Sequence, residues 1–154
     1  MELYKILYPM RICLITSRYD GKDNIMTAAW VSPVSWDPVL FAVSVGRERF
    51  SCQLIRNGKA FGINLPDERL SDASLLCGTE SGRDSDKFSK AGLSKEDGRK
   101  VALIKECPLS IECELVNEME AGDHVIFVGK PITVKERFEA KGLYQAREQK
   151  FISL

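Results

Sequence analysis

The 154-residue chain carries 22 basic and 22 acidic side chains, so its formal net charge at pH 7 is zero. This length suits one well-buried domain over residues 1–154 and is too short for two. The balanced charge implies no general attraction to nucleic acid or to an anionic membrane, and no apolar run approaches the roughly 20 residues of a membrane span. Residues 1–5 lack a signal-peptide pattern, so we expect a cytoplasmic protein.

Short apolar runs between turn signals predict strands in the first third of the chain. The first run, residues 11–17, is followed by an Asp-Gly turn, and two more cover residues 25–31 and 39–45. A polar corner, residues 32–38 (SPVSWDP), separates the second run from the third.

Helical spacing begins after the third predicted strand. Phe50 and Leu54 lie four residues apart and indicate a short helix that ends at an Asn-Gly pair. Residues 60–65 are predicted to form another strand, stopped by a proline. A second helix then runs up to Gly78, with Asp67 as its cap.

The second half of the chain begins polar and returns to strands. Residues 79–100 are polar and glycine-rich, which predicts a loop with one helical turn. Strands are predicted over residues 109–116 and 124–128, joined by a turn at 118–123, and Pro131 should mark an edge or a bulge. Six or seven short strands with two short helices indicate a small antiparallel barrel with helical corners.

The five cysteines show no metal-site or dithiol spacing. None is separated from another as C-x-x-C, and they stand at Cys13, Cys52, Cys77, Cys107 and Cys113. We therefore expect free, mostly buried thiols and no metal site. Cys52 is the exception, because a place in the first turn of a helix beside Arg49 would stabilise its thiolate.

Residues 46–51 (GRERFS) place two arginines and a serine at a predicted helix start. A helix start presents unpaired backbone N–H groups and the positive end of a dipole, which suit a phosphate. Arginine adds charge-assisted bonds to phosphate oxygens. From composition alone, a solvated loop remains the alternative.

Five pieces of this chain, taken in order, match the motifs of one known family. They are residues 24–30 (NIMTAAW), 32–38 (SPVSWDP), 44–51 (SVGRERFS), 81–88 (SGRDSDKF) and 122–129 (GDHVIFVG). Together they resemble the flavin reductase-like family with an FMN-binding split β-barrel, in the branch of flavoredoxins and archaeal ferric reductases. The resemblance implies a mainly β fold: a Greek-key, antiparallel split β-barrel of six or seven strands with short peripheral helices.

The resemblance also implies which strand borders the cofactor. In the family that strand corresponds to residues 24–29, so Asn24, Met26, Thr27, Ala28 and Ala29 become candidates for FMN binding. Small side chains there would let the backbone approach the pyrimidine edge of the ring. The alternative is that small residues simply fill a tight barrel interior.

Ser44, Arg47 and Ser51 match the family's phosphate region. Arg49 is the weaker candidate, since a position two residues from Arg47 can direct its side chain elsewhere. Lys87, in the Asp-Lys-Phe piece, is placed near the cofactor by the resemblance and could neutralise charge at the phosphate or at the reduced ring. A solvated lysine is the alternative.

His124 is the only histidine in the chain and follows Gly122-Asp123. The resembling enzymes carry a histidine at this point facing the flavin, which implies a catalytic role in positioning nicotinamide or stabilising the reduced ring. An ordinary strand residue is the alternative. Trp30 and Trp36 are predicted to be structural, although Trp36 could also cover an edge of the ring.

The resemblance implies an FMN-dependent oxidoreductase that passes electrons from NAD(P)H, a transient donor, through bound FMN to free flavin, a ferric chelate or a redox partner protein. No Gly-x-Gly-x-x-Gly follows a predicted strand, so a Rossmann unit for the donor is not expected. The alternatives are a non-enzymatic FMN-binding electron carrier and a split-barrel binding module that has lost the flavin.

We expect a homodimer with FMN at the subunit interface. A barrel of this size is filled by its own side chains, so the cofactor must lie on an outer face. A two-fold partner would cover that face, which is also how the resembling family is built. Tyr4 and Tyr8 could add a lid from the same subunit, with core packing as the alternative.

Overall fold

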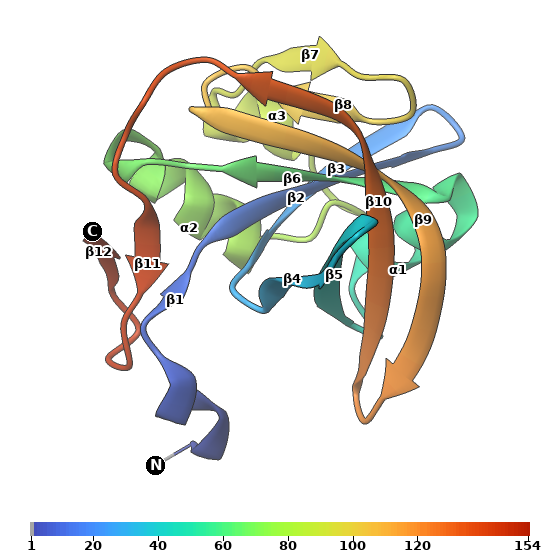
Figure 1. The fold of residues 1–154 in the computed structure, drawn as a ribbon. Coiled ribbons are helices and arrows are strands. Elements are labelled where there is room, and N and C mark those ends of the chain that lie inside the picture. The colour runs from blue at the N-terminus through green and yellow to red at the C-terminus, as the bar shows by residue number, and fades with distance from the viewer. Residues whose placement is uncertain (1) are drawn as a thin grey trace.

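Residues 2–154 are described by a computed structural model built around one antiparallel sheet of seven strands (Figure 1). In sheet order the strands are β3 (Lys22–Ala28), β2 (Cys13–Tyr19), β6 (Ala60–Leu65), β9 (Leu109–Ala121), β10 (His124–Glu136), β5 (Val39–Gly46) and β4 (Val31–Trp36). The two edge strands, β3 and β4, are consecutive in the chain. The sheet curls, because Met26 and Ala28 of β3 at one edge share a buried cluster with Val43 and Val45 of β5 near the other edge. The mainly β barrel fold is therefore confirmed.

Short elements surround the barrel. The helices are α1 (Phe50–Gly58), α2 (Ser71–Thr79) and α3 (Lys87–Ala91), with 3₁₀ turns η1 (Leu3–Leu7) and η2 (Glu68–Leu70). The smaller sheets are β1 (Met10–Arg11), β11 (Leu143–Gln145) and β12 (Phe151–Ser153), and the hairpin β7 (Lys95–Asp97) and β8 (Ala102–Ile104). Within residues 2–154, none of the helices combines the length and the apolar character needed to cross a membrane.

Alternating side chains of the strands contribute to two of the three buried apolar clusters of residues 2–154. In β2, Ile15 points into the barrel with Phe61 and Phe127, whereas Leu14 points outward. The outward residues pack with one face of α2 and α3, including Phe88. Phe61 and Phe127 are fully buried, so large side chains fill the barrel, as expected for this size.

Two predicted boundaries moved for physical reasons. The strand predicted over 25–31 covers 22–28. Residue 31 and residues 32–36 of the predicted polar corner form the edge strand β4. An edge strand tolerates Pro33, and the register shifts between Pro33 and Ser35. Likewise, the expected bulge at Pro131 is confirmed by the register shift between Pro131 and Thr133 in β9–β10.

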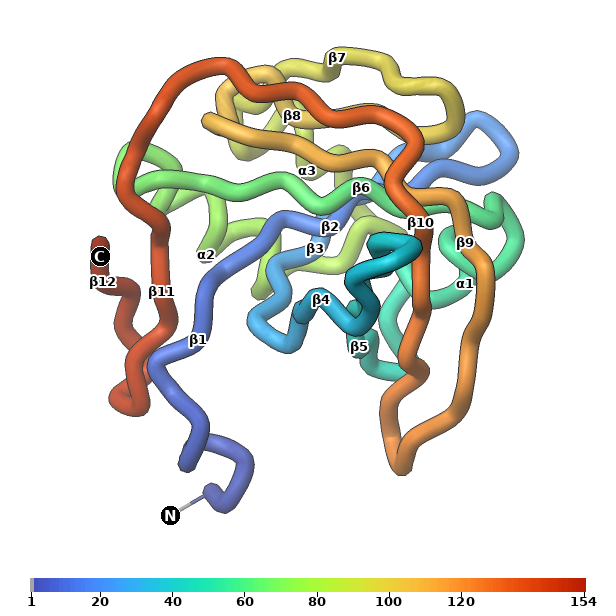
Figure 2. The backbone as a smooth tube through the Cα atoms, viewed as in Figure 1, coloured from blue at the N-terminus to red at the C-terminus, as the bar shows by residue number. Residues whose placement is uncertain are grey.

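The turn predicted at residues 118–123 is shorter in the structure. β9 continues to Ala121, and only Gly122 and Asp123 separate it from β10. This outer part of β9 is mostly exposed, so it lacks the one-sided apolar alternation that reveals a strand in sequence. The tip of this hairpin and the N-terminal segment extend to the same end of the barrel (Figure 2).

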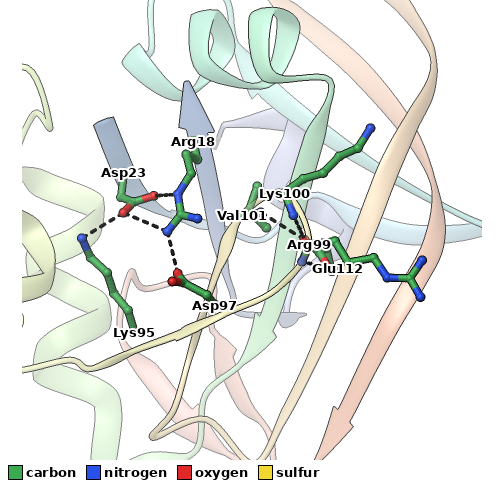
Figure 3. A network of polar contacts seen from close by, with 8 residues as sticks. All are labelled: Arg18, Asp23, Lys95, Asp97, Arg99, Lys100, Val101 and Glu112. Atoms are coloured by element: carbon green, nitrogen blue, oxygen red, sulfur yellow. Dashed lines mark hydrogen bonds and ion pairs between the residues drawn. The ribbon is translucent and has the colours of Figure 1, made fainter. Parts of the chain in front are cut away.

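Two polar networks fasten the β7–β8 hairpin to the barrel (Figure 3). Arg18 donates to Asp23 at 2.6 Å and to Asp97 of β7 at 2.7 Å, and Lys95 pairs with Asp23 at 2.9 Å. On β9, the fully buried Glu112 carboxylate accepts bonds from the backbone N–H groups of the turn before β8.

Candidate functional site

A narrow cavity of about 210 Å³ lies between β3, the start of α1 and the segment that follows α2. Its floor is buried and includes Asn24, Ser51 and Lys87, which are 3%, 1% and 4% exposed. Its rim is exposed and includes Glu48 and Arg83. The cavity therefore has a deep polar floor and a mouth that opens to solvent.

The first turn of α1 forms one wall of this cavity. Among the described residues, no side chain caps this helix start, and the first turn holds no acidic residue. No acidic side chain of the first turn therefore offsets the positive end of the helix dipole at this wall. Arg49, which precedes the helix, also lines the cavity.

Lys87 brings a second cationic group to the cavity floor. Its Nζ donates to the carbonyls of Ile25 at 2.8 Å and Cys77 at 2.9 Å. These partners are neutral, and an ammonium group has a third N–H to donate. Burial lowers the pKa of Lys87, and the charge of Arg49 lowers it further. An anion in the cavity would compensate both cations.

Asn24 joins β3 to the other two walls. Its Nδ2 donates to Ser51 Oγ at 2.9 Å, while its buried Oδ1 has no hydrogen-bond partner among the described residues. A Cβ on residue 82 would lie 2.0 Å from that oxygen, so the close approach requires Gly82. The structure thus brings three predicted residues together: Asn24, Ser51 and Lys87.

Arg47 and Arg49 lie in different places relative to the narrow cavity. Arg47 Nη2 donates to the Gly122 carbonyl at 2.6 Å and lies 3.8 Å from Glu120 Oε2, both in the β9–β10 hairpin. Its backbone N–H also donates to Asp123, which continues the pairing of β5 with β10. The structure therefore does not bring Arg47 to Ser51, whereas Arg49 lines the cavity.

A wider cavity of about 540 Å³ shares Met26 and Arg49 with the narrow one, so the two form one groove. Predicted residues line it along β3 and the link that follows: Thr27, Ala28 and Ala29. Ser44, expected at the phosphate, lines this wide end instead. The groove thus has a narrow cationic end and a wide end.

Thr27 offers backbone rather than side-chain groups to the wide end. Its Oγ1 donates to the Ser74 carbonyl of α2 at 2.5 Å. β3 is an edge strand, and the Ile25 carbonyl on its free edge accepts from Lys87. Because backbone groups alternate between the two edges, Thr27 presents its N–H and C=O along the same free edge as Ile25.

Aromatic rings form the far wall of the wide end. The ring centroids of Trp30 and His124 lie 4.8 Å apart with an interplanar angle of 35°. Trp30 Nε1 donates to the Tyr8 hydroxyl at 3.2 Å, and the Tyr4 and Trp30 centroids are 5.5 Å apart. Trp30, which was predicted to be structural, is part of the groove wall. Its position directly after Ala29 was the sequence feature that could have indicated this. Trp36 is 92% exposed, so it packs in no core of residues 2–154, and it does not line the groove.

His124 begins β10 opposite Gly46 and lines the groove. Its Nδ1 lies 2.7 Å from Asp123 Oδ1, and the hydrogen bond to His124 lowers the pKa of Asp123. A carboxylate partner at Nδ1 favours a proton on that nitrogen and leaves Nε2 for a ligand. Asp123, which sequence reasoning did not single out, therefore orients the imidazole.

The expected free and buried thiols are confirmed for all five cysteines. The prediction of a stabilised thiolate at Cys52 was wrong, because Cys52 is 2% exposed and burial raises the pKa of its thiol. Its side chain belongs to the barrel core rather than to the groove.

A model of the flavin reductase like domain matches residues 4–153 of this chain. The chain belongs to the flavin reductase-like family. A protein from Archaeoglobus fulgidus is 38% identical over 136 residues, spanning 87% of this chain and 76% of that protein. A flavin reductase from Pseudomonas putida is 32% identical over 124 residues, spanning 79% and 70%. The crystal structure of flavoredoxin from Methanosarcina acetivorans superposes with a TM-score of 0.89 at 25% identity, covering 96% of this chain and 86% of that one.

The residues of this flavin reductase-like protein fit a phosphate group and the ring of a flavin. Lys87, Arg49 and the uncapped start of α1 would hold the phosphate, and the unpartnered Oδ1 of Asn24 could accept from a hydroxyl of the sugar chain. The free edge of β3 at Thr27 suits the donors and acceptors of the ring's pyrimidine part.

Proposed function

We propose that this protein is an FMN-dependent oxidoreductase that takes electrons from NADH or NADPH and delivers them to free flavin, a ferric chelate or a redox partner protein. The observation that carries the proposal is the two-part groove: a cationic end sized for a phosphate, continuous with an aromatic-lined end beside a free strand edge. A flavin bound there supplies a ring that accepts two electrons and can release them in one or two steps.

The chain itself supplies binding, orientation and placement of charge. Arg49 and Lys87 hold the phosphate, and the Thr27 backbone fixes the in-plane orientation of the ring. Asp123 holds His124 in one orientation, and Trp30 packs against the imidazole. His124 therefore has a fixed position at the groove, from which it can orient the nicotinamide of the donor or stabilise charge on the reduced ring.

We also propose that two copies associate across the aromatic end of the groove. An apolar depression of about 450 Å³ beside the groove is lined by Leu7, Met10, Val31 and Ile126. Tyr4 and Trp30 line both this depression and the groove. Leu7 is 76% exposed, and apolar surface of this kind is commonly covered by a partner. A second copy seated there would supply the missing wall over the ring.

The direct test is an anaerobic titration of the FMN-loaded protein with NADH and with NADPH, followed through the visible absorbance of the oxidised flavin. Rapid bleaching by one of the two supports the proposed activity. The similarity to flavoredoxin favours a second candidate, an electron carrier without a nicotinamide site. Failure of both nucleotides, with reduction by a reduced carrier protein, would favour that candidate. A protein that binds no flavin would exclude both.

A further inference from the structure

The mouth of the narrow cavity is crossed by one arginine side chain. Arg83 Nη1 donates to the Glu48 carbonyl at 3.3 Å, and its guanidinium carbon lies 5.3 Å from the centroid of the Phe50 ring. Arg83 belongs to the segment after α2, whereas Glu48 and Phe50 lie where β5 passes into α1. We call this contact the Arg83 bridge. It joins two walls of the cavity at its exposed rim.

Hydrogen bonds and close packing hold the segment that carries Arg83 in place. The Arg83 N–H donates to Ser81 Oγ at 3.2 Å, and Gly82 packs against the buried Asn24 amide. On its other side the Asp84 N–H donates to the Ser81 carbonyl at 3.2 Å. The backbone on both sides of Arg83 is therefore anchored, which directs its side chain across the mouth.

The size of the narrow cavity limits what can lie beyond the phosphate. Its volume of about 210 Å³ is below the roughly 300 Å³ at which pockets for whole ligands begin. FMN ends at its phosphate, whereas FAD continues from that phosphate into an adenylate. With the ring in the wide end, the adenylate would have to leave through the rim that the Arg83 bridge crosses.

The charge of the cofactor phosphates favours FMN over FAD, as the size of the cavity does. The terminal phosphate of FMN is a monoester and carries about −1.5 to −2 at pH 7. Each phosphate in the pyrophosphate of FAD has one ester and one anhydride linkage and carries a single negative charge. The cations that line the cavity, the buried Lys87 and the exposed Arg49, together with the start of α1, therefore favour the more highly charged group.

We propose that the Arg83 bridge makes this protein select FMN over FAD by closing the phosphate end of the groove against an adenylate. The inference rests on the proposed flavin site and adds a specificity-determining residue to it. Arg83 acts here by occupying the mouth, so its removal should change the affinity for FAD more than the affinity for FMN.

The test measures dissociation constants for FMN, FAD and riboflavin with the wild type, Arg83→Ala and Arg99→Ala. Arg99 is an exposed arginine whose side chain points away from the Glu112 network, so Arg99→Ala controls for the lost charge (Figure 3). The wild type should prefer FMN, and Arg83→Ala should bind FAD about tenfold more tightly, since the bridge joins a charged hydrogen bond to a cation–π contact. Arg99→Ala should match the wild type.

A second variant tests the bridge without removing a charge. Phe50→Leu keeps an apolar side chain but removes the ring beneath the guanidinium, so it should tighten FAD binding in the same direction. Circular dichroism and thermal unfolding establish that each variant is folded. Equal affinity of the wild type for FMN and FAD, or unchanged FAD affinity in Arg83→Ala, would overturn the inference while leaving the flavin site intact. Binding of none of the three flavins to the wild type would instead overturn the proposed function.

Discussion

Replacing Glu112 by glutamine should destabilise the fold without changing its shape. The carboxylate is fully buried and accepts four hydrogen bonds. Those from Arg99, Lys100 and Val101 are drawn in Figure 3. Oε1 accepts from the Arg99 N–H and the Thr133 hydroxyl, both at 2.9 Å, and Oε2 accepts from the N–H groups of Lys100 at 2.6 Å and Val101 at 3.0 Å. Glutamine has nearly the same volume, but its amide nitrogen is a donor that faces other donors.

The expected loss of stability depends on which carboxylate oxygen the amide nitrogen replaces. Glutamine should adopt the placement that leaves fewer N–H groups without an acceptor. At the Oε1 position, the Thr133 hydroxyl can rotate to accept, and only the Arg99 N–H loses its acceptor. At the Oε2 position, two backbone N–H groups would lose theirs. Loss of one hydrogen bond to a charged group costs about 1.5–3 kcal/mol, so we expect Glu112→Gln to lower the free energy of unfolding by about that amount. This is a large part of the roughly 5–15 kcal/mol typical of a domain.

Urea denaturation followed by circular dichroism measures the difference. Glu114→Gln is the matched control, because Glu114 lies two residues further along β9 and makes a half-exposed ion pair with Lys100 at 3.0 Å. Such pairs contribute about 0–1 kcal/mol, so this variant should stay close to the wild type. Equal stability of Glu112→Gln and Glu114→Gln would refute the reasoning.

The same comparison should depend on pH with a defined sign. Burial alone would raise the pKa of Glu112, but the three backbone N–H donors and the Thr133 hydroxyl outweigh it and lower the pKa. A lowered folded-state pKa gives stability that is complete above the unfolded value of about 4.3 and is lost as the pH falls through the folded value. The stability gap between wild type and Glu112→Gln should therefore narrow on acidification below about pH 4.3. A gap independent of pH would contradict the assignment of the shift to this site.

Three further predictions concern the groove. Arg49→Ala should weaken FMN binding by about 1.5–3 kcal/mol in a fluorescence titration but leave riboflavin binding unchanged. Arg47→Ala should bind FMN like the wild type, because the Arg47 guanidinium donates to the Gly122 carbonyl. Equal losses of FMN affinity in both variants would show that Arg49 does not hold the phosphate. His124→Ala should slow flavin reduction by the nicotinamide donor in stopped-flow experiments while FMN affinity stays within about 1 kcal/mol, and an unchanged rate would leave His124 as an ordinary strand residue. Light scattering should give twice the 17.3 kDa chain mass, with loss of flavin on dilution, whereas a monomer that keeps its FMN would exclude an interface site.

The sequence alone determined most elements of this fold. The strand predicted over 60–65 has those bounds in the structure, and the helix predicted from Phe50 runs to Gly58. The predictions for these segments were correct because the segments are buried on one face or throughout, so the spacing of their apolar residues indicates the type of element. The stretches that form the groove were also identified from sequence, since their motifs are local.

Only the tertiary structure decided which side chains of those stretches meet. Arg47 and Arg49 are alike in sequence, but the β9–β10 hairpin accepts a bond from the first and leaves the second at the cavity. From the sequence alone, Lys87 cannot be distinguished from a solvated lysine. In the structure, its Nζ donates to the carbonyls of Ile25 and Cys77. Each of these choices depends on partners far away in the chain. A pattern of neighbouring residues fixes the backbone of an element, but the direction and burial of a polar side chain are set by the surfaces that folding brings against it.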